Sequence, residues 1–234
     1  MDSPRGTSRL LPSRTGQRPV LIAHTGGNSL AQAAAAIERG ADLVEIDLFV
    51  RGSAFEARHA RSLHPLPVWL EGCRPAIAPR GRYGLVELLA FARGKDEVLL
   101  DLKSGGPRAA HLVRAAMDEA GGGIEVAASS QVWSTLRALA ALCPEVDLYY
   151  SIDVRPQLDL FLSVMERDNL PAGVSCRHTQ LSPPLVRKLH DRDLLVVAWT
   201  VDDEKRAIEL ATWGVDGITT HRPRELRAAL FPGP

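Results

Sequence analysis

Short apolar runs separated by longer amphipathic stretches recur along the chain from Val20 onward. A continuous apolar run of strand length predicts a strand buried on both faces, as in a parallel sheet covered by its crossover helices. Eight such runs alternate with helical patterns, which predicts an α/β protein with a closed (β/α)8 TIM barrel. The runs are Val20–His24, Leu43–Asp47, Val98–Lys103, Ile124–Ala128, Leu148–Ser151, Gly173–Arg177, Leu194–Thr200 and Gly217–Thr220.

Several of the predicted helices carry recognisable ends. Asn28 or Ser29 can cap a helix over Leu30–Arg39, which Gly40 ends. Asp202 or Asp203 can cap another over Glu204–Trp213. Proline in the first turn favours two more, and these cover 185–191 and 224–230. Helices of this length are the connections that parallel barrel strands require.

The stretch from Leu48 to Tyr83 departs from this alternation and is rich in Pro, Gly and Arg. It contains two candidate short strands, Phe55–His59 and Pro67–Leu70. We interpret it as a small insertion after the second strand. An insertion at that point lies on the carboxyl-terminal face of a barrel, where active sites of this fold are built.

Composition narrows the class of protein further. The chain has 234 residues, and we expect a disordered N-terminal arm over 1–18 and one domain over 19–234. The 28 basic and 28 acidic residues balance, so no nucleic-acid partner is expected. No apolar run approaches the roughly 20 residues of a membrane span, and the arm lacks a signal-peptide core. Cys73, Cys143 and Cys176 are far apart in the sequence, so we expect reduced thiols and a cytoplasmic location. The sequence does not indicate an oligomeric state.

Carboxylates cluster at the ends of the second and third predicted strands. Glu45 and Asp47 alternate along one strand and point the same way, as Asp101 and Lys103 do on the next. Carboxylates held side by side repel unless a cation lies between them, and oxygen ligands suit a divalent cation such as Mg²⁺ or Ca²⁺. Lys103 could hold a phosphate oxygen. The same pattern also fits a core-facing and a solvent-facing acid, with a strand-end ion pair.

Two histidines could supply proton transfer. His24 ends the first strand and precedes two glycines, while His59 lies in the insertion next to Arg58. Phosphodiester cleavage needs one group to accept a proton and another to protonate the leaving oxygen. A structural histidine and a solvated basic loop are the alternatives. Trp199, late in the seventh strand, fits the core or an apolar wall for an alcohol group. His221, after the eighth strand, is expected on the surface or in a loop.

Five segments in order resemble motifs of the glycerophosphodiester phosphodiesterase family, within the phosphatidylinositol-phosphodiesterase-like TIM barrel superfamily. The resemblance covers most of the chain, from about Val20 to Leu230. The segments are Ile22-Ala23-His24-Thr25-Gly26, Gly40–Asp47, Arg58-His59, Leu100–Lys103, and Ala198–Val201 with Gly214–Thr220.

The resemblance implies a metal-dependent hydrolase that cleaves a glycerophosphodiester to an alcohol and glycerol 3-phosphate. His24 and His59 match the family's acid/base pair, and Lys103 matches its phosphate-contacting lysine. Glu45, Asp47 and Asp101 match its metal ligands. We add Trp199 and Arg58 as substrate-binding candidates.

The chain departs from the family pattern at several positions. Thr25 stands where the family has arginine, Asp101 where it has glutamate, Ala60 where an acidic residue is usual, and His221 where an aspartate is usual. The glutamate of the family's motif near Asn28 is absent as well. These departures keep two alternatives open. One is the related cleavage of lysolipids, of the lysophospholipase D or sphingomyelinase D kind, which can release a cyclic phosphate. The other is a barrel that binds phosphoesters without turnover.

Overall fold

The structure is a computed structural model that describes residues 18–59, 61–62, 68–71, 74–77, 84–93, 97–121, 124–165 and 171–232. The expected N-terminal arm, apart from Arg18, lies outside these described residues, and so do Ala60 and Cys73. None of the helices in the described ranges is long and apolar enough to cross a membrane.

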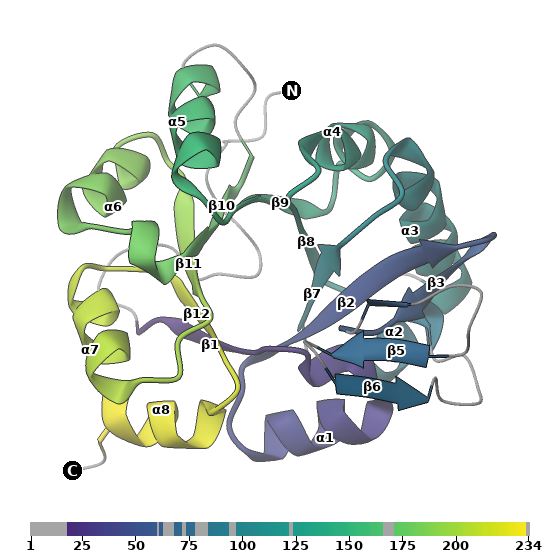
Figure 1. The fold of residues 1–234 in the computed structure, drawn as a ribbon, viewed down its shortest axis with the longest axis horizontal. Helices are drawn as coiled ribbons and strands as arrows, with labels where there is room; N and C mark the ends of the chain where they lie inside the picture. Colours follow the sequence, from purple (N-terminus) through teal and green to yellow (C-terminus); the bar gives the residue numbers. More distant parts are fainter. Residues whose placement is uncertain are drawn as a thin grey trace.

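The described residues form a closed parallel barrel of eight strands (Figure 1). The strands follow the order β1-β12-β11-β10-β9-β8-β7-β2, and pairing of β1 with β2 closes the ring. The predicted TIM barrel is therefore confirmed. Its strands are β1 Val20–Ala23, β2 Leu43–Arg51, β7 Glu97–Leu102, β8 Val126–Ser130, β9 Asp147–Ile152, β10 Gly173–Arg177, β11 Leu195–Trp199 and β12 Gly217–Thr220.

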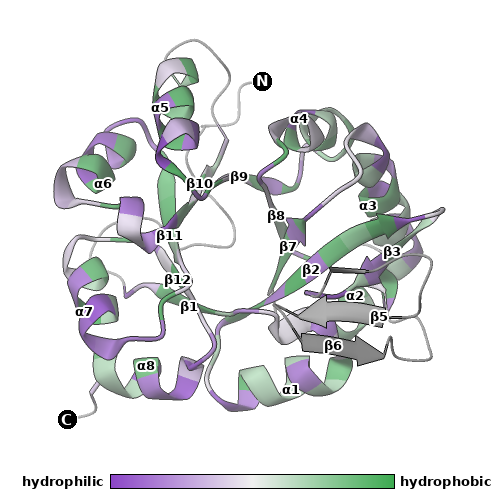
Figure 2. Ribbon diagram, viewed as in Figure 1, coloured by the Kyte–Doolittle hydropathy of each residue, from purple (hydrophilic) through white to green (hydrophobic). Residues whose placement is uncertain are grey.

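Helices surround the barrel and cover its outer face (Figure 1). Figure 2 shows hydrophobic residues along the barrel strands and both hydrophobic and hydrophilic stretches on outer helices such as α1, α7 and α8, as expected for helices that bury one side. The helices are α1 Leu30–Glu38, α2 Leu85–Ala92, α3 Pro107–Ala120, α4 Trp133–Leu142, α5 Arg155–Val164, α6 Pro183–His190, α7 Glu204–Thr212 and α8 Pro223–Leu230, with short 3-10 turns η1 Gly26–Asn28 and η2 His178–Gln180.

The predicted insertion after the second strand is present. β3 (Ala54–Ala57) folds back antiparallel onto β2, which continues beyond its predicted end at Asp47 as far as Arg51. A separate small sheet follows, made of β4 (Arg61–Ser62), β5 (Val68–Glu71) and β6 (Arg74–Ile77). Strands β3 and β5 overlap the two predicted short strands, whereas β4 and β6 were not predicted.

The interior of the barrel has two layers of different chemistry. Alternate residues of a strand face the same side, so each strand contributes to both layers. The layer at the amino-terminal ends of the strands is an apolar cluster that fills this part of the barrel. It consists of Val20, Ile22, Leu43, Leu99, Ala127, Tyr149, Leu195 and Val197. Two residues further along several of the same strands, the inward positions are polar.

Candidate active site

Three carboxylates meet at the carboxyl ends of β2 and β7. Asp47 lies directly opposite Asp101 in the β2–β7 register, and Glu45 is one inward position earlier on β2. Ligand oxygens of these three side chains lie within 4.8 Å of one another. Glu45 and Asp47 are buried, so water screens the repulsion between their charges only weakly. The strand alternation that predicted a shared face therefore brings the three acids together.

Lys103 is the counter-ion of this group. Its Nζ lies 3.0 Å from Asp47 Oδ1 and also contacts Asp101 Oδ2. Burial lowers the pKa of Lys103, but the carboxylates of Asp101, Asp47 and Glu45 outweigh burial and raise it overall. The lysine thus keeps its charge. When all three acids are ionised, one ammonium against three carboxylates leaves two negative charges uncompensated.

Burial and the surplus of negative charge shift the pKa values of the acids. Burial, followed by repulsion from Asp101 and Asp47, raises the pKa of Glu45 well above its ordinary value. Burial also raises the pKa of Asp101, although Lys103 acts against it. Glu45 Oε2 is buried and has no hydrogen-bond partner among the described residues. An all-oxygen donor set, two excess charges and one unpartnered buried oxygen fit a hard divalent cation.

Asn28 holds Asp47 in place from the neighbouring loop. Asn28 Nδ2 donates to Asp47 Oδ2 at 2.8 Å, and Asn28 Oδ1 accepts from the Asp47 backbone N–H at 2.9 Å. The loop can lie this close because Gly27 has no side chain: a Cβ there would be 3.0 Å from the carbonyl oxygen of Glu45. Of the two predicted caps of α1, Ser29 is the one that accepts from Gln32 N–H. Asn28 instead supports the candidate metal site.

Thr25, at the position where the family pattern has arginine, contributes its backbone. It adopts a left-handed conformation with φ of 57°, which is uncommon for a residue with a β-branched side chain. Its backbone N–H forms a hydrogen bond with Glu45 that lowers the pKa of that carboxyl, against the larger effect of burial. This turn therefore fixes one of the three acids.

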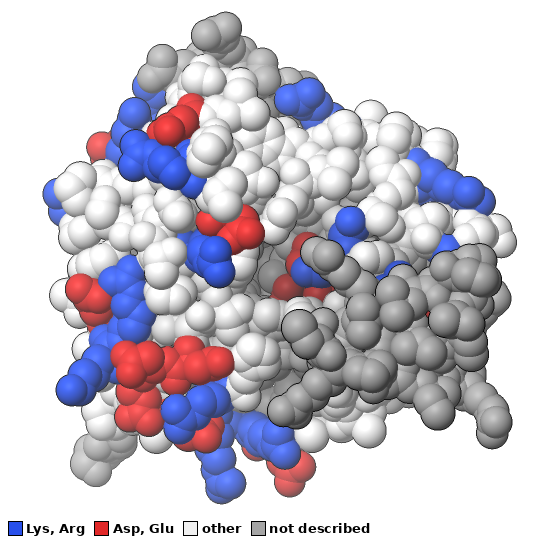
Figure 3. All heavy atoms as spheres, in the orientation of Figure 1, with Lys and Arg blue, Asp and Glu red and all other residues white. Residues whose placement is uncertain are grey.

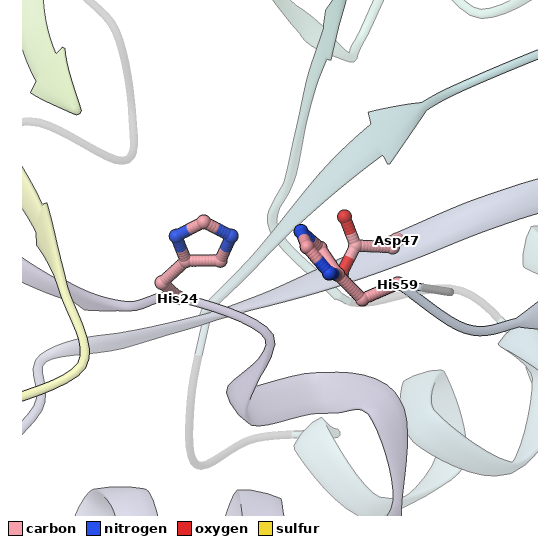
Figure 4. A group of neighbouring side chains, drawn as sticks. All are labelled: His24, Asp47 and His59. Carbon is pink, nitrogen blue, oxygen red and sulfur yellow. The ribbon is translucent and has the colours of Figure 1, made fainter. Parts of the chain in front are cut away.

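The two predicted catalytic histidines face each other across the site (Figure 4). The rings of His24 and His59 form an edge contact with centroids 5.5 Å apart. Their ligand nitrogens and an Asp47 oxygen lie within 4.8 Å of one another, so they also form a candidate group for a metal. His24 Nδ1 is hydrogen-bonded to Thr200 Oγ1 at 2.8 Å, which leaves Nε2 for other partners. Burial, then the nearby His221, lowers the pKa of His24 to about 4.

A third histidine lies against His24. The rings of His221 and His24 are stacked, with centroids 4.5 Å apart and an interplanar angle of 15°. His221 Nδ1 lies 2.8 Å from Asp202 Oδ2. The side chain of His221 is 53% exposed, as expected for a loop residue, but its contact with His24 was not predicted.

The opposite wall of the barrel mouth is lined by hydroxyl groups. Ser129, Ser151, Ser175 and Thr219 occupy the polar layer on β8, β9, β10 and β12, and all four are buried. Together with Trp199 and the carboxylate group they enclose a pocket of about 140 Å³. The buried indole Nε1 of Trp199 has no hydrogen-bond partner among the described residues. Figure 3 shows acidic and basic side chains gathered in a hollow near the centre of this face.

A second, wider pocket of about 450 Å³ opens beside the first. Both pockets are lined by His59, Asp101, Lys103 and Gln131, so these residues stand at the boundary between them. The outer pocket adds three apolar residues, which are Phe49, Leu102 and Val132.

The structure brings most of the predicted site residues to one place. His24, His59, Glu45, Asp101, Lys103 and Trp199 line the inner pocket, and Asp47 contacts Lys103. Arg58 lies elsewhere: its guanidinium covers the Phe49 ring at 3.9 Å and its Nε pairs with Glu56 at 3.0 Å. The pockets do not include it among their lining residues. Its role in substrate binding stays a prediction.

The chain matches the model of the glycerophosphoryl diester phosphodiesterase family over residues 108–225. A curated relative from Bacillus subtilis (strain 168), YhdW, is provisionally named a glycerophosphodiester phosphodiesterase. It is 38% identical over 50 residues, a segment that spans 21% of this chain and only 21% of that relative's length.

Solved structures share the fold over nearly the full chain. A provisionally named glycerophosphoryl diester phosphodiesterase from Silicibacter pomeroyi DSS-3 superposes with a TM-score of 0.78 and 20% identity, covering 94% of this chain and 95% of its own. A phosphodiesterase from Oleispira antarctica, in complex with the product sn-glycerol-3-phosphate, gives a TM-score of 0.73 and 18% identity, covering 91% and 96%. At these identities the likeness concerns the fold.

Proposed function

Because this chain belongs to the glycerophosphoryl diester phosphodiesterase family, we propose that it hydrolyses glycerophosphodiesters to an alcohol and glycerol 3-phosphate. The observation that carries the proposal is the meeting of two histidines, three carboxylates and one lysine around one pocket. The family model matches from residue 108 onward, so these side chains support the activity independently of the matched segment.

The proposal includes a divalent cation, Mg²⁺ or Ca²⁺, held by Glu45, Asp47 and Asp101. When all three are ionised, they exceed the charge of Lys103 by two; this excess and the unpartnered Glu45 oxygen support the cation. When bound, the cation would neutralise the charge that develops on the phosphoryl oxygens. Lys103, at the same edge, would bind one of these oxygens as a point charge.

The two imidazoles supply the proton transfers. Water attacks phosphorus, the bond between phosphorus and the alcohol oxygen breaks, and a proton passes from the water to one imidazole. The other imidazole gives a proton to the departing alcohol oxygen. His24 enters this cycle through Nε2, since Thr200 occupies Nδ1, and its lowered pKa favours the neutral, proton-accepting form.

The hydroxyl-lined inner pocket supports a glycerophosphodiester over a lysolipid. The hydroxyls of Ser129, Ser151, Ser175 and Thr219 and the Trp199 N–H can exchange hydrogen bonds with the two free hydroxyls of glycerol. At about 140 Å³ it is well below the ~300 Å³ or more of pockets for drug-sized ligands, and its polar walls would leave an acyl chain in contact with buried hydroxyls. The alcohol would then extend into the wider outer pocket.

Assay of the purified chain with glycerophosphodiesters tests the proposal. We expect release of glycerol 3-phosphate that requires Mg²⁺ or Ca²⁺ and stops with EDTA. His24→Ala and His59→Ala should each lower kcat by roughly 100-fold or more, whereas His111→Ala, at an exposed position on α3, should leave it unchanged. Phosphorus NMR identifies the product. Absence of turnover with either metal would contradict the proposal, and a cyclic phosphate product would favour the lysolipid-type reaction instead.

A further inference from the structure

Residues from the carboxyl ends of β11 and β12 contact His24. The backbone N–H of His24 donates to Thr220 O at 2.9 Å, and its Nδ1 is bonded to Thr200 Oγ1. The ring of His221 covers one face of the imidazole. Residues from the ends of β11 and β12 therefore determine how this side chain lies at the end of β1.

Asp202 in turn fixes His221. Its Oδ1 accepts from the His221 backbone N–H at 2.8 Å and from Thr220 Oγ1 at 2.9 Å, while its Oδ2 meets His221 Nδ1. Burial acts to raise the pKa of Asp202, but the hydrogen bonds from His221 and Thr220 outweigh it and lower the pKa overall. Asp202 is thus an ionised acceptor, and His221 Nδ1 is the donor.

This arrangement limits the orientations open to His24. An unsupported imidazole at a strand end can rotate about χ2, whose energy profile is broad. A stacked ring on one face and a hydrogen bond on Nδ1 together select one orientation. His221 can provide the stacking surface only because Asp202 holds its own ring, despite the exposure of the loop.

We propose that His221, anchored by Asp202, is a positioning residue that holds the imidazole of His24 in its working orientation. His221 does not line the inner pocket that holds Glu45, Asp101 and Lys103; it lines a separate hollow of about 370 Å³ beside His24, so we place its action on His24. The inference rests on the proposed function, because it assigns His24 a part in the reaction. The proposed role belongs to a position where this chain departs from the family pattern, because His221 stands where an aspartate is usual.

Comparison of His221→Ala with His221→Phe tests the stacking. Outer residues that orient a functional group typically change activity by roughly 10- to 100-fold when removed, so we expect a loss of about 10-fold in kcat for His221→Ala with KM little changed. Phenylalanine keeps a flat ring against His24 and should recover most of kcat. His111→Ala serves as the matched control, since it removes an exposed histidine far along the sequence on α3. Wild-type kcat in His221→Ala, or equal losses in the Ala and Phe variants, would overturn the proposal.

An observation on His24 itself separates this inference from the activity. In metal-free protein labelled with ¹⁵N, the ring nitrogens of His24 should show one fixed tautomer, with Nδ1 and Nε2 shifts well apart. His221→Ala should bring the two shifts closer together, while His111→Ala should leave them unchanged. Unchanged His24 shifts in His221→Ala would refute the positioning role even if the protein hydrolyses glycerophosphodiesters. Changed shifts in a protein without turnover would support the positioning role while the proposed function fails.

Discussion

The side-chain amide of Asn28 is bonded to Asp47 twice, donating to its carboxylate and accepting from its backbone N–H. Outer groups of this kind orient a metal ligand, and their loss typically costs 10–100-fold in metal affinity. We expect Asn28→Ala to weaken Ca²⁺ or Mg²⁺ binding by roughly that factor, measured by titration calorimetry. The neighbouring Ser29→Ala is the control, because it removes a helix cap worth ~1 kcal/mol without touching Asp47. Equal affinities in both variants would contradict the role of Asn28.

Glu45 should destabilise the metal-free protein and stabilise the metal-bound one. Its folded pKa lies above its ordinary value of 4.5, so stability is lost as pH rises from that value through the folded pKa. Metal-free Glu45→Gln should therefore have a higher Tm than wild type at about pH 8, and the difference should shrink toward about pH 4.

Added Ca²⁺ should reverse this order, because only wild type keeps the third carboxylate. Calorimetric Tm values with and without Ca²⁺ measure both effects, and Glu38→Gln, on the exposed side of α1, is the control. If Ca²⁺ raised the Tm of wild type and Glu45→Gln equally, Glu45 would not be a ligand.

His24 should titrate far below an ordinary histidine in the metal-free protein. Its folded pKa is about 4 against a usual 6.5, so between these values the unfolded chain binds a proton that the folded chain does not. This difference removes stability as pH falls from about 6.5 to about 4. Proton NMR of the ring, assigned by its absence in His24→Gln, should give a midpoint near 4. A midpoint close to 6.5 would show that burial and His221 do not act on His24 in this way.

The hydroxyl wall should matter for substrate binding more than for chemistry. Ser151 and Ser175 are direct neighbours in the β9–β10 register, so one ligand can reach both. Each neutral hydrogen bond contributes about 0.5–1.5 kcal/mol, so we expect Ser151→Ala combined with Ser175→Ala to raise KM for glycerophosphoethanolamine roughly 10-fold with little change in kcat. Ser163→Ala on the exposed side of α5 is the control. An unchanged KM would place the glycerol elsewhere.

The barrel and the carboxylate group could be predicted because both follow from strand periodicity. Each predicted apolar run overlaps a barrel strand, and alternation alone put Glu45 and Asp47 on one side of β2. Asp101 near the end of β7 and Lys103 directly after it follow from the same rule, and β7 is the neighbour of β2 in the ring. Local sequence was sufficient for this prediction, because side chains alternate between the two faces of a strand whatever the rest of the fold.

The supporting residues could not be predicted, because they depend on loops and on long-range contacts. Thr200 meets His24 across 176 positions of sequence, and Asn28 reaches Asp47 through a left-handed turn at Thr25. One signal was available for Asp202 and His221: they follow adjacent strands, whose carboxyl ends meet at the same rim. The sequence likewise could not show that Arg58 would pair with Glu56 on β3.

Among the described residues, the apolar cluster closes the amino-terminal end of the barrel beneath the candidate active site. Val20, Leu43, Tyr149, Leu195 and their neighbours fill the amino-terminal end, so no ligand passes through the ring of strands. In the proposed reaction, substrate, water and both products would therefore enter and leave at the carboxyl-terminal rim, where β3 folds back onto β2 near His59. In the proposed reaction, a product still bound in the inner pocket would occupy the space that the next substrate needs.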